Sequence, residues 1–243
     1  MNIKTDYSPG EFESSKFSHL KAPYQKSLDV IKGLGYETED YLHYFPAFAG
    51  HLTLIRYLTL YEGYKQVLDV SGHIAELGMY KGACSLLFAK LVKIFEPNAL
   101  TQVHGFDWFR GSEGLNEKES EHISEDAYCE SLDRVQSLVT AQSLDNILKI
   151  HDMDLASEEI EAFFNTYPHL YFKLVFIDAG IEKVLRRCLP LFWNRLTKGG
   201  MVIFDHYSFD LAPDEAPIIQ EILPDIEIRA FPNGWMPVGY AIK

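Results

Sequence analysis

From Gly72 to the C-terminus, short apolar runs alternate with longer amphipathic stretches. Strands covered by helices on both faces are apolar along their whole length, so each short run predicts a buried strand. The predicted strands are Ile74–Gly78, Val103–Asp107, Ile147–Asp152, Leu174–Asp178 and Met201–Asp205, and the predicted helices are Ala83–Phe95, Glu125–Leu138, Ser157–Asn165 and Glu182–Leu196. This alternation predicts an α/β fold with a mostly parallel sheet between two layers of helices.

The last part of the chain departs from this alternation. Glu227–Phe231 and Val238–Ile242 have the pattern of two strands, and the segment 232–237 between them, which contains Pro and Gly, suits a hairpin. One edge of the sheet should therefore be antiparallel, which gives a Rossmann-like, seven-stranded sheet. A parallel sheet that ends in an antiparallel hairpin is typical of class I methyltransferases, whereas a dehydrogenase Rossmann domain lacks this ending.

The region before the alternating pattern differs from it. The first 18 residues are polar, and helical patterns follow at Tyr24–Leu34 and Leu52–Tyr64. A chain of 243 residues is long enough for one large α/β domain with an extension, but short for two full domains. We predict an N-terminal helical cap at residues 1–65 and a single methyltransferase domain at residues 66–243.

The composition narrows the range of partners. The chain has 22 basic and 35 acidic residues, a net charge of −13, and an acidic surface repels nucleic acid. The longest mostly apolar stretch, Phe45–Leu60, contains His51 and Arg56 and is too short and too polar to span a bilayer. Because the N-terminus lacks the apolar core of an export signal, we expect a cytoplasmic enzyme without a membrane partner. We also expect a homo-oligomer, as for many enzymes of this size.

A glycine turn follows the first predicted strand and opens the next helix, in the sequence Glu76-Leu77-Gly78-Met79-Tyr80-Lys81-Gly82. Its Gly-x-x-x-Gly spacing differs from the Gly-x-Gly-x-x-Gly of dinucleotide-binding folds. The N–H groups of a helix N-terminus suit a carboxylate, which the methionine part of S-adenosylmethionine supplies. Glu76 would repel a pyrophosphate but suits the ammonium group of this donor. The turn therefore predicts a site for S-adenosylmethionine.

Neighbouring strand ends predict further donor-binding residues. Asp107 ends the second strand, where its carboxylate can accept hydrogen bonds from both ribose hydroxyls. Trp108 would pack on the adenine, and Asp152, at the end of the third strand, would lie by the adenine amino group. The alternatives are that Glu76 and Asp107 cap loops and that Trp108 covers the edge of the sheet. The complete predicted donor site is Glu76, Gly78, Tyr80, Gly82, Ser85, Asp107, Trp108 and Asp152.

The last two predicted parallel strands both end in acids. Asp178 ends one of them, and Asp205 ends the other and is followed by His206. Adjacent strands bring these side chains together, and two carboxylates with an imidazole can bind a divalent metal such as Mg²⁺ or Mn²⁺. Such a metal would lower the pKa of an acceptor hydroxyl and ease its attack on the methyl sulfonium. The alternative is a metal-free site in which the acids cap helices or orient the substrate.

Two other segments are candidates for the mouth of the site. The polar stretch Arg110–Glu125 suits a lid over the acceptor, with an ordinary surface loop as the alternative. Tyr44, Phe45 and Arg56 could shape the entrance, but we favour core packing for the two aromatic residues and a surface charge for Arg56.

Together these motifs resemble the macrocin O-methyltransferase family, whose members methylate sugars in antibiotic and deoxyhexose pathways. The resemblance runs over residues 45–207 and rests on Phe45–Glu62, Glu76–Gly82, Gly105–Gly111, Asp178 and Leu196–Tyr207. It implies Mg²⁺-dependent transfer to a sugar hydroxyl. It also implies that Asp178, Asp205 and His206 stand at the family's metal-binding positions, although His206 replaces an acid.

The sequence departs from this family after Asp178. The family has Asp-Gly-Asp here, and its second Asp is the proposed general base, whereas this chain has Gly180 at that position. His206 and Glu182 are the nearest replacements, and a neutral histidine is a competent base near pH 7. We predict catalytic roles for Asp178 and His206 in O-methylation of a sugar or nucleotide-linked sugar. The alternatives are a catechol or phenol O-methyltransferase, and a degenerate member that binds S-adenosylmethionine without turnover.

Overall fold

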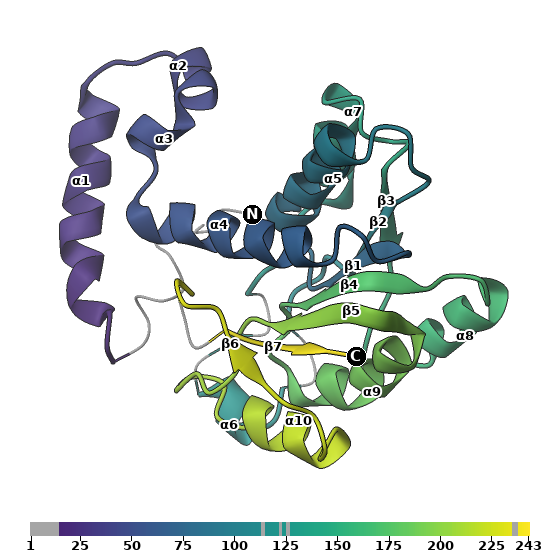
Figure 1. Cartoon of the computed structure of the whole chain (residues 1–243). Coiled ribbons are helices and arrows are strands. Elements are labelled where there is room, and N and C mark those ends of the chain that lie inside the picture. Colours follow the sequence, from purple (N-terminus) through teal and green to yellow (C-terminus); the bar gives the residue numbers. More distant parts are fainter. Residues whose placement is uncertain (1–14, 113–114, 122, 125–126, 235–237) are drawn as a thin grey trace.

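The computed structural model describes residues 15–112, 115–121, 123–124, 127–234 and 238–243. Its centre is a seven-stranded sheet with the strand order β3-β2-β1-β4-β5-β7-β6 (Figure 1). The strands are β1 (His73–Leu77), β2 (Val103–Asp107), β3 (Leu148–Asp152), β4 (Phe172–Ile177), β5 (Leu196–Phe204), β6 (Arg229–Ala230) and β7 (Gly239–Ile242). Strands β1 to β5 run parallel, and β7 pairs antiparallel with both β5 and β6. The predicted Rossmann-like fold with an antiparallel C-terminal edge is confirmed.

Helices cover both faces of the sheet, as the apolar strands require. Successive residues of a strand point to opposite faces, so Phe176 joins one buried cluster and Val175 the other. The first face is covered by α5 (Ala83–Phe95) and α7 (Leu132–Ala141), and the second by α8 (Glu159–Thr166), α9 (Glu182–Arg195) and α10 (Glu215–Ile222). This two-layer packing fixes the carboxyl ends of the parallel strands along a single edge.

Several predicted boundaries need correction. Strand β4 ends at Ile177, so Asp178 lies in the loop beyond it, and β5 begins at Leu196, where a helix end was expected. Helix α7 begins only at Leu132, because Ser131 accepts a hydrogen bond from the N–H of Arg134 and caps the helix there; residues 125 and 126 of the predicted helix lie outside the described residues.

The C-terminal part also differs in detail from the prediction. Helix α10 is absent from the predicted elements; its Pro217 stands in the first turn, where a missing N–H costs no helical hydrogen bond. The hairpin strands β6 and β7 are shorter than predicted, and the last three residues of the predicted connection, 235–237, lie outside the described residues.

The N-terminal region is an arm followed by a helix of the core. After a short 3-10 turn, η2 (Ser18–Leu20), the arm consists of α1 (Lys21–Gly33), α2 (Thr38–His43) and α3 (Phe45–Phe48), none of which contains a buried residue within residues 21–48. Helix α1 stands away from the sheet (Figure 1). Ala49 and Gly50 are extended and separate this arm from the next helix.

Helix α4 (His51–Gln66) packs directly on the main body. It buries Leu60 and Tyr64 in the first core cluster, whereas Leu58 of the same helix is exposed. The division of the chain at residue 65 stays a prediction. Among the described residues, no helix is both long enough and apolar enough to cross a bilayer.

Candidate active site

One cavity of about 430 Å³ lies at the carboxyl ends of the parallel strands. Residues that end or follow four different strands line it: Gly78 after β1, Asp107 at the end of β2, Asp178 after β4 and Asp205 after β5. This is the edge at which open α/β sheets bind their ligands. The glycine turn and the acidic cluster, which are far apart in the sequence, therefore share one cavity.

The glycine turn depends on its unusual backbone. Gly78 has φ +89°, and a Cβ there would lie 2.3 Å from the carbonyl oxygen of Asp178, so the loops after β1 and β4 touch at this point. Gly82 has a left-handed conformation and precedes the first residue of α5. Tyr80, with φ +48°, lines the cavity between them. The turn thus brings the N-terminus of α5 close to the cavity, as predicted.

Glu76 lines the cavity but is almost completely buried. The hydroxyl of Ser85 donates a hydrogen bond to its carboxylate, and burial raises the pKa of Glu76 to about 7. Ser85 and Gly82 are not among the described residues that line the cavity. Both fit a supporting role: Gly82 forms the end of the turn, and Ser85 holds the carboxylate of Glu76.

Asp107 is held by the backbone of its neighbours. One carboxylate oxygen accepts a hydrogen bond from the N–H of Tyr80 (2.8 Å) and the other from the N–H of Phe109 (2.7 Å). Burial raises the pKa of Asp107, and these hydrogen bonds oppose the increase. A carboxylate has about four acceptor sites, so it can also accept from a ribose.

Trp108 and Asp152, the other two side chains predicted near the adenine, differ in their position relative to the cavity. Trp108 lines the cavity, and its indole N–H donates to the carbonyl of Gly111. Asp152 ends the edge strand β3 and pairs with Arg110 at 3.5 Å near the surface. Met153 and Asp154, rather than Asp152, line the cavity at this point.

The acidic side chains after β4 and β5 lie together in the structure, and an arginine lies between them. Ligand atoms of Asp178, Asp205 and His206 lie within 4.8 Å of one another. Arg56 of α4 donates a hydrogen bond from Nη1 to Asp205 (3.0 Å) and from Nη2 to Asp178. Burial and the charge of Asp205 raise the pKa of Asp178. Burial also acts to raise the pKa of Asp205, but the charges of Arg56 and His206 hold it below its ordinary value.

The interpretation of Arg56 as a surface charge is therefore wrong. The sequence does carry a signal: Arg56 lies four residues from both Leu52 and Leu60, which are buried, so helical spacing places it on the packed face of α4. Tyr44 and Phe45 are exposed, and the core packing favoured for them is wrong as well. Neither is among the described residues that line the cavity.

His206 lies against the residue that replaces the family's base. A Cβ added to Gly180 would touch the His206 ring, 3.4 Å from Nδ1. On another side, Nδ1 is 3.9 Å from a carboxylate oxygen of Glu215, at the start of α10. Burial lowers the pKa of His206, and burial with the charge of Asp205 raises the pKa of Glu215 to about 8. Glu215 is absent from the predicted site because its helix was not predicted.

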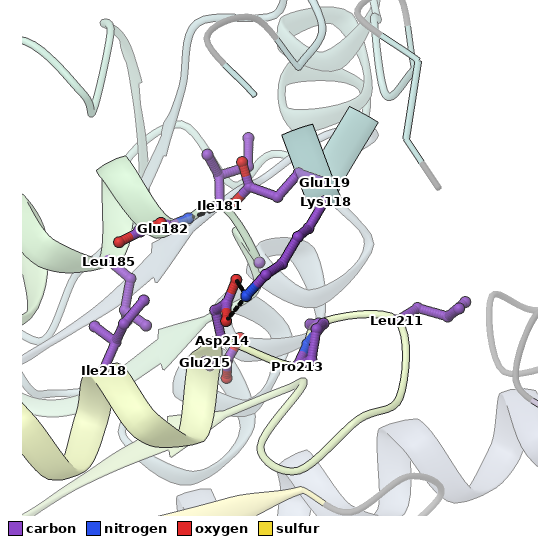
Figure 2. A pocket seen from close by; sticks show the side chains of 12 residues that line it. Lys118, Glu119, Ile181, Glu182, Leu185, Leu211, Pro213, Asp214, Glu215 and Ile218 are labelled. Atoms are coloured by element: carbon purple, nitrogen blue, oxygen red, sulfur yellow. Dashed lines mark hydrogen bonds and ion pairs between the residues drawn. The ribbon is translucent and has the colours of Figure 1, made fainter. Parts of the chain in front are cut away.

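Glu182, the other candidate base, does not line this cavity among the described residues. Figure 2 shows it in a smaller adjoining pocket, below a short helix that follows β2. In this helix, α6 (Glu117–Ser120), Glu119 accepts a hydrogen bond from the backbone N–H of Glu182, and Lys118 pairs with Asp214 at 2.7 Å. The described part of the predicted lid Arg110–Glu125 is thus attached to the starts of α9 and α10.

The arrangement can be tested against the predicted divalent metal. Such an ion needs carboxylate oxygens at about 2.0–2.6 Å, yet the Oδ2 atoms of Asp178 and Asp205 both accept hydrogen bonds from Arg56. A metal bound between them would displace the guanidinium or lie beside another positive charge. The three side chains therefore fit a guanidinium in this arrangement and do not fit a divalent metal at the same place.

Comparison with solved structures shows the same fold elsewhere. A structure described as CalS11, a calicheamicin methyltransferase, has a TM-score of 0.80 and 21% identity over 94% of this chain and 93% of that chain. An apo structure of CalS11, described as a TDP-rhamnose 3'-O-methyltransferase, has a TM-score of 0.72 and 22% identity over 94% and 95%. The O-methyltransferase TomG from Streptomyces achromogenes, in complex with S-adenosylmethionine, has a TM-score of 0.51 and 13% identity over 75% and 78%.

Sequence comparison identifies the family itself. No curated protein matches the chain. A family described as a methyltransferase domain matches residues 75–207, from β1 to just beyond β5. These residues include the glycine turn, Asp107 and the acidic cluster, and they amount to more than half of the chain. The protein therefore belongs to this methyltransferase family, and the enzyme class predicted from its sequence is confirmed.

Proposed function

We propose that this protein is an S-adenosylmethionine-dependent O-methyltransferase that acts on a hydroxyl of a sugar or nucleotide-linked sugar. The observation that carries the proposal is the single cavity that joins the glycine turn and Asp107 to Arg56, Asp178 and His206. A methyl donor held at one end would face an acceptor held at the other. Direct transfer between two substrates requires them to meet in one water-excluding space.

The donor end consists mainly of backbone. In the proposed complex, the N-terminus of α5 faces the carboxylate of S-adenosylmethionine, where N–H groups and the helix dipole favour negative charge. Asp107 accepts hydrogen bonds from the ribose, and Trp108 packs beside the adenine. Gly82 and Ser85 support the turn, and we leave Asp152 out because it lies beside Arg110 near the surface.

The acceptor end supplies the proton acceptor. The acceptor hydroxyl loses its proton to the imidazole of His206 while its oxygen attacks the methyl carbon. Burial keeps the pKa of His206 low, so the ring is neutral and able to accept a proton near pH 7. Asp178 orients the hydroxyl. No step of this proposal uses a divalent metal, because Arg56 binds the carboxylates that the predicted Mg²⁺ or Mn²⁺ site requires.

The proposed sugar acceptor is supported by the extent of the structural similarity. The likeness to CalS11 covers 94% of this chain, so it includes most of the arm and α4 as well as the sheet. One observation favours a second candidate, a phenol or catechol acceptor. Two parts of the cavity wall are apolar. Ile181 and Val184 line it around the start of α9, and Phe209 and Leu211 line it in the loop after β5.

A product assay separates these acceptors. The protein is incubated with S-adenosylmethionine and a panel of nucleotide-linked deoxyhexoses, simple glycosides and catechols, and mass spectrometry follows the gain of one methyl group. We expect methylation within the sugar classes only. Methylation of catechols alone would replace the sugar with a phenol. Binding of S-adenosylhomocysteine without methylation of any acceptor would favour the degenerate, non-catalytic alternative.

A further inference from the structure

The acidic cluster obtains its positive charge from within the chain. Arg56 reaches from α4 to Asp178 after β4 and Asp205 after β5, and its guanidinium lies 5.7 Å from the ring centre of Phe176. Asp205 is 1% exposed, so bulk water does not solvate its charge and a positive partner has to stabilise it. Glu76 and Cys84 also line the cavity, and their ligand atoms lie within 4.8 Å of a carboxylate oxygen of Asp178. The guanidinium thus pairs with both acids of the cluster.

Two features of the site point in the same direction. Arg56 adds a positive charge between the carboxylates, and His206 stands where the resembled family has a further acid. Mg²⁺ prefers oxygen ligands in octahedral geometry, so loss of an acid weakens its site. A guanidinium does not need octahedral oxygen ligands, because its planar fork can bind two carboxylates at once. It also keeps its charge at any working pH. The surroundings therefore suit arginine better than a metal.

We propose that Arg56 takes the place of a divalent metal in this active site, so that the enzyme transfers methyl groups without binding one. The reaction itself rests on the proposed function. In that reaction the O–H bond of the acceptor breaks and its proton goes to His206. The oxygen forms a bond to the methyl carbon, and the electrons of the broken S–C bond stay on sulfur, which becomes neutral. Arg56 is a positioning residue that holds Asp178 and Asp205 and stabilises negative charge developing in the cavity.

The central test measures metal binding and requires no acceptor. Calorimetry follows Mn²⁺ and Mg²⁺ added to the protein with S-adenosylhomocysteine bound. We expect no binding to the wild-type protein at submillimolar metal. Arg56→Met, which keeps an unbranched side chain but is shorter and uncharged, should bind Mn²⁺ at least tenfold more tightly than the wild type does. A further Asp205→Asn substitution should abolish that binding.

Two results would overturn the proposal. One is wild-type binding of Mn²⁺ or Mg²⁺ that Asp205→Asn abolishes, because the metal would then share the cluster with Arg56. This measurement does not depend on the folding of any Arg56 variant. The other is a folded Arg56→Met protein, verified by circular dichroism and S-adenosylhomocysteine binding, that binds no metal.

An activity assay adds a second readout. With a methylated acceptor in hand, EDTA should leave the wild-type rate unchanged. Arg56→Met should lose at least a hundredfold in EDTA, Arg56→Lys should lose less, and Mn²⁺ should raise the rate of Arg56→Met alone. Loss of wild-type activity in EDTA, restored by metal, would disprove the proposal. If no acceptor is methylated, the proposed function fails, and the calorimetry still decides the role of Arg56.

Discussion

The donor end and the acceptor end of the cavity are constructed differently. At the donor end, one continuous segment, Glu76–Gly82, supplies a turn whose backbone and helix N-terminus form most of the site. At the proposed acceptor end, Arg56, His206 and Glu215 come from separate elements. Arg56 and His206 both lie against Asp205, and His206 also lies against Glu215. The comparison teaches that a site made of backbone is encoded locally, whereas a site made of side chains is encoded by the packing of distant segments.

The largest expected effect breaks the donor end. Gly78→Ala places a Cβ 2.3 Å from the carbonyl oxygen of Asp178, so the two loops must separate. We expect S-adenosylhomocysteine affinity to fall more than a hundredfold and the free energy of unfolding to fall by about 3 kcal/mol. Isothermal calorimetry and urea unfolding provide the two measurements.

Gly199→Ala is the matched control for this substitution. Gly199 also has a positive φ, +84°, but its added Cβ meets only Val70, at 3.6 Å. It should cost about 1 kcal/mol of stability and leave donor affinity intact. Equal losses in the two variants would mean that backbone strain alone, and not the contact with the loop after β4, explains the effect.

The next effect concerns the acceptor end alone. His206→Asn keeps a polar side chain of similar size but removes the proton acceptor, so turnover should fall by roughly a hundredfold or more. Affinity for S-adenosylhomocysteine should not change, because His206 lies at the other end of the cavity. A variant with full turnover would exclude His206 as the base, and a variant that loses donor affinity would show that the two ends are not separable.

A smaller effect is expected for Asp107, the carboxylate proposed to bind the ribose of the donor. Asp107→Ala removes an acceptor of charge-assisted hydrogen bonds and also frees the N–H groups of Tyr80 and Phe109. Donor affinity should fall by about 2 kcal/mol, roughly thirtyfold. Asp152→Ala serves as the control, since Asp152 pairs with Arg110 near the surface. If Asp152→Ala weakens binding as much as Asp107→Ala does, the assignment of the ribose site is wrong.

The smallest expected effect concerns the contribution of Glu215, at the acceptor end, to the stability of the protein. The pKa of Glu215 is raised in the folded protein to about 8, above its unfolded value. Folding therefore favours the neutral form of Glu215. Its contribution to the free energy of unfolding is fully present below the unfolded pKa and is lost as the pH rises toward 8. Glu215→Gln should therefore raise the melting temperature by a few degrees at pH 8 and change it little at pH 4. An equal gain at both values would show that packing, rather than charge, is responsible.

The same contrast explains how far the sequence alone could lead. The parallel strands, α5 and the glycine turn follow from apolar runs and glycine spacing, which are local signals. Asp107 and Asp178 could be found because acids at the ends of parallel strands point to the ligand edge. Asp152 has the same local signal, but its strand lies at the edge of the sheet, and its side chain turns to Arg110.

Arg56 and Glu215 do not follow from the ends of strands. Helical spacing puts Arg56 on the packed face of α4, but it reaches the cluster only because α4 packs across the sheet, a tertiary arrangement that its own segment does not specify. Glu215 belongs to a short helix that begins with a Pro-containing turn and carries a buried acid, both of which obscure the usual pattern. The missed residues are those whose position is determined by other segments.

The close approach of Gly180 and His206 also limits how the two positions can be varied. A Cβ at position 180 would lie in van der Waals contact with the imidazole, so a longer side chain that points the same way has to displace the ring. The two positions are therefore structurally coupled, since a larger side chain at position 180 and the present orientation of His206 compete for the same space.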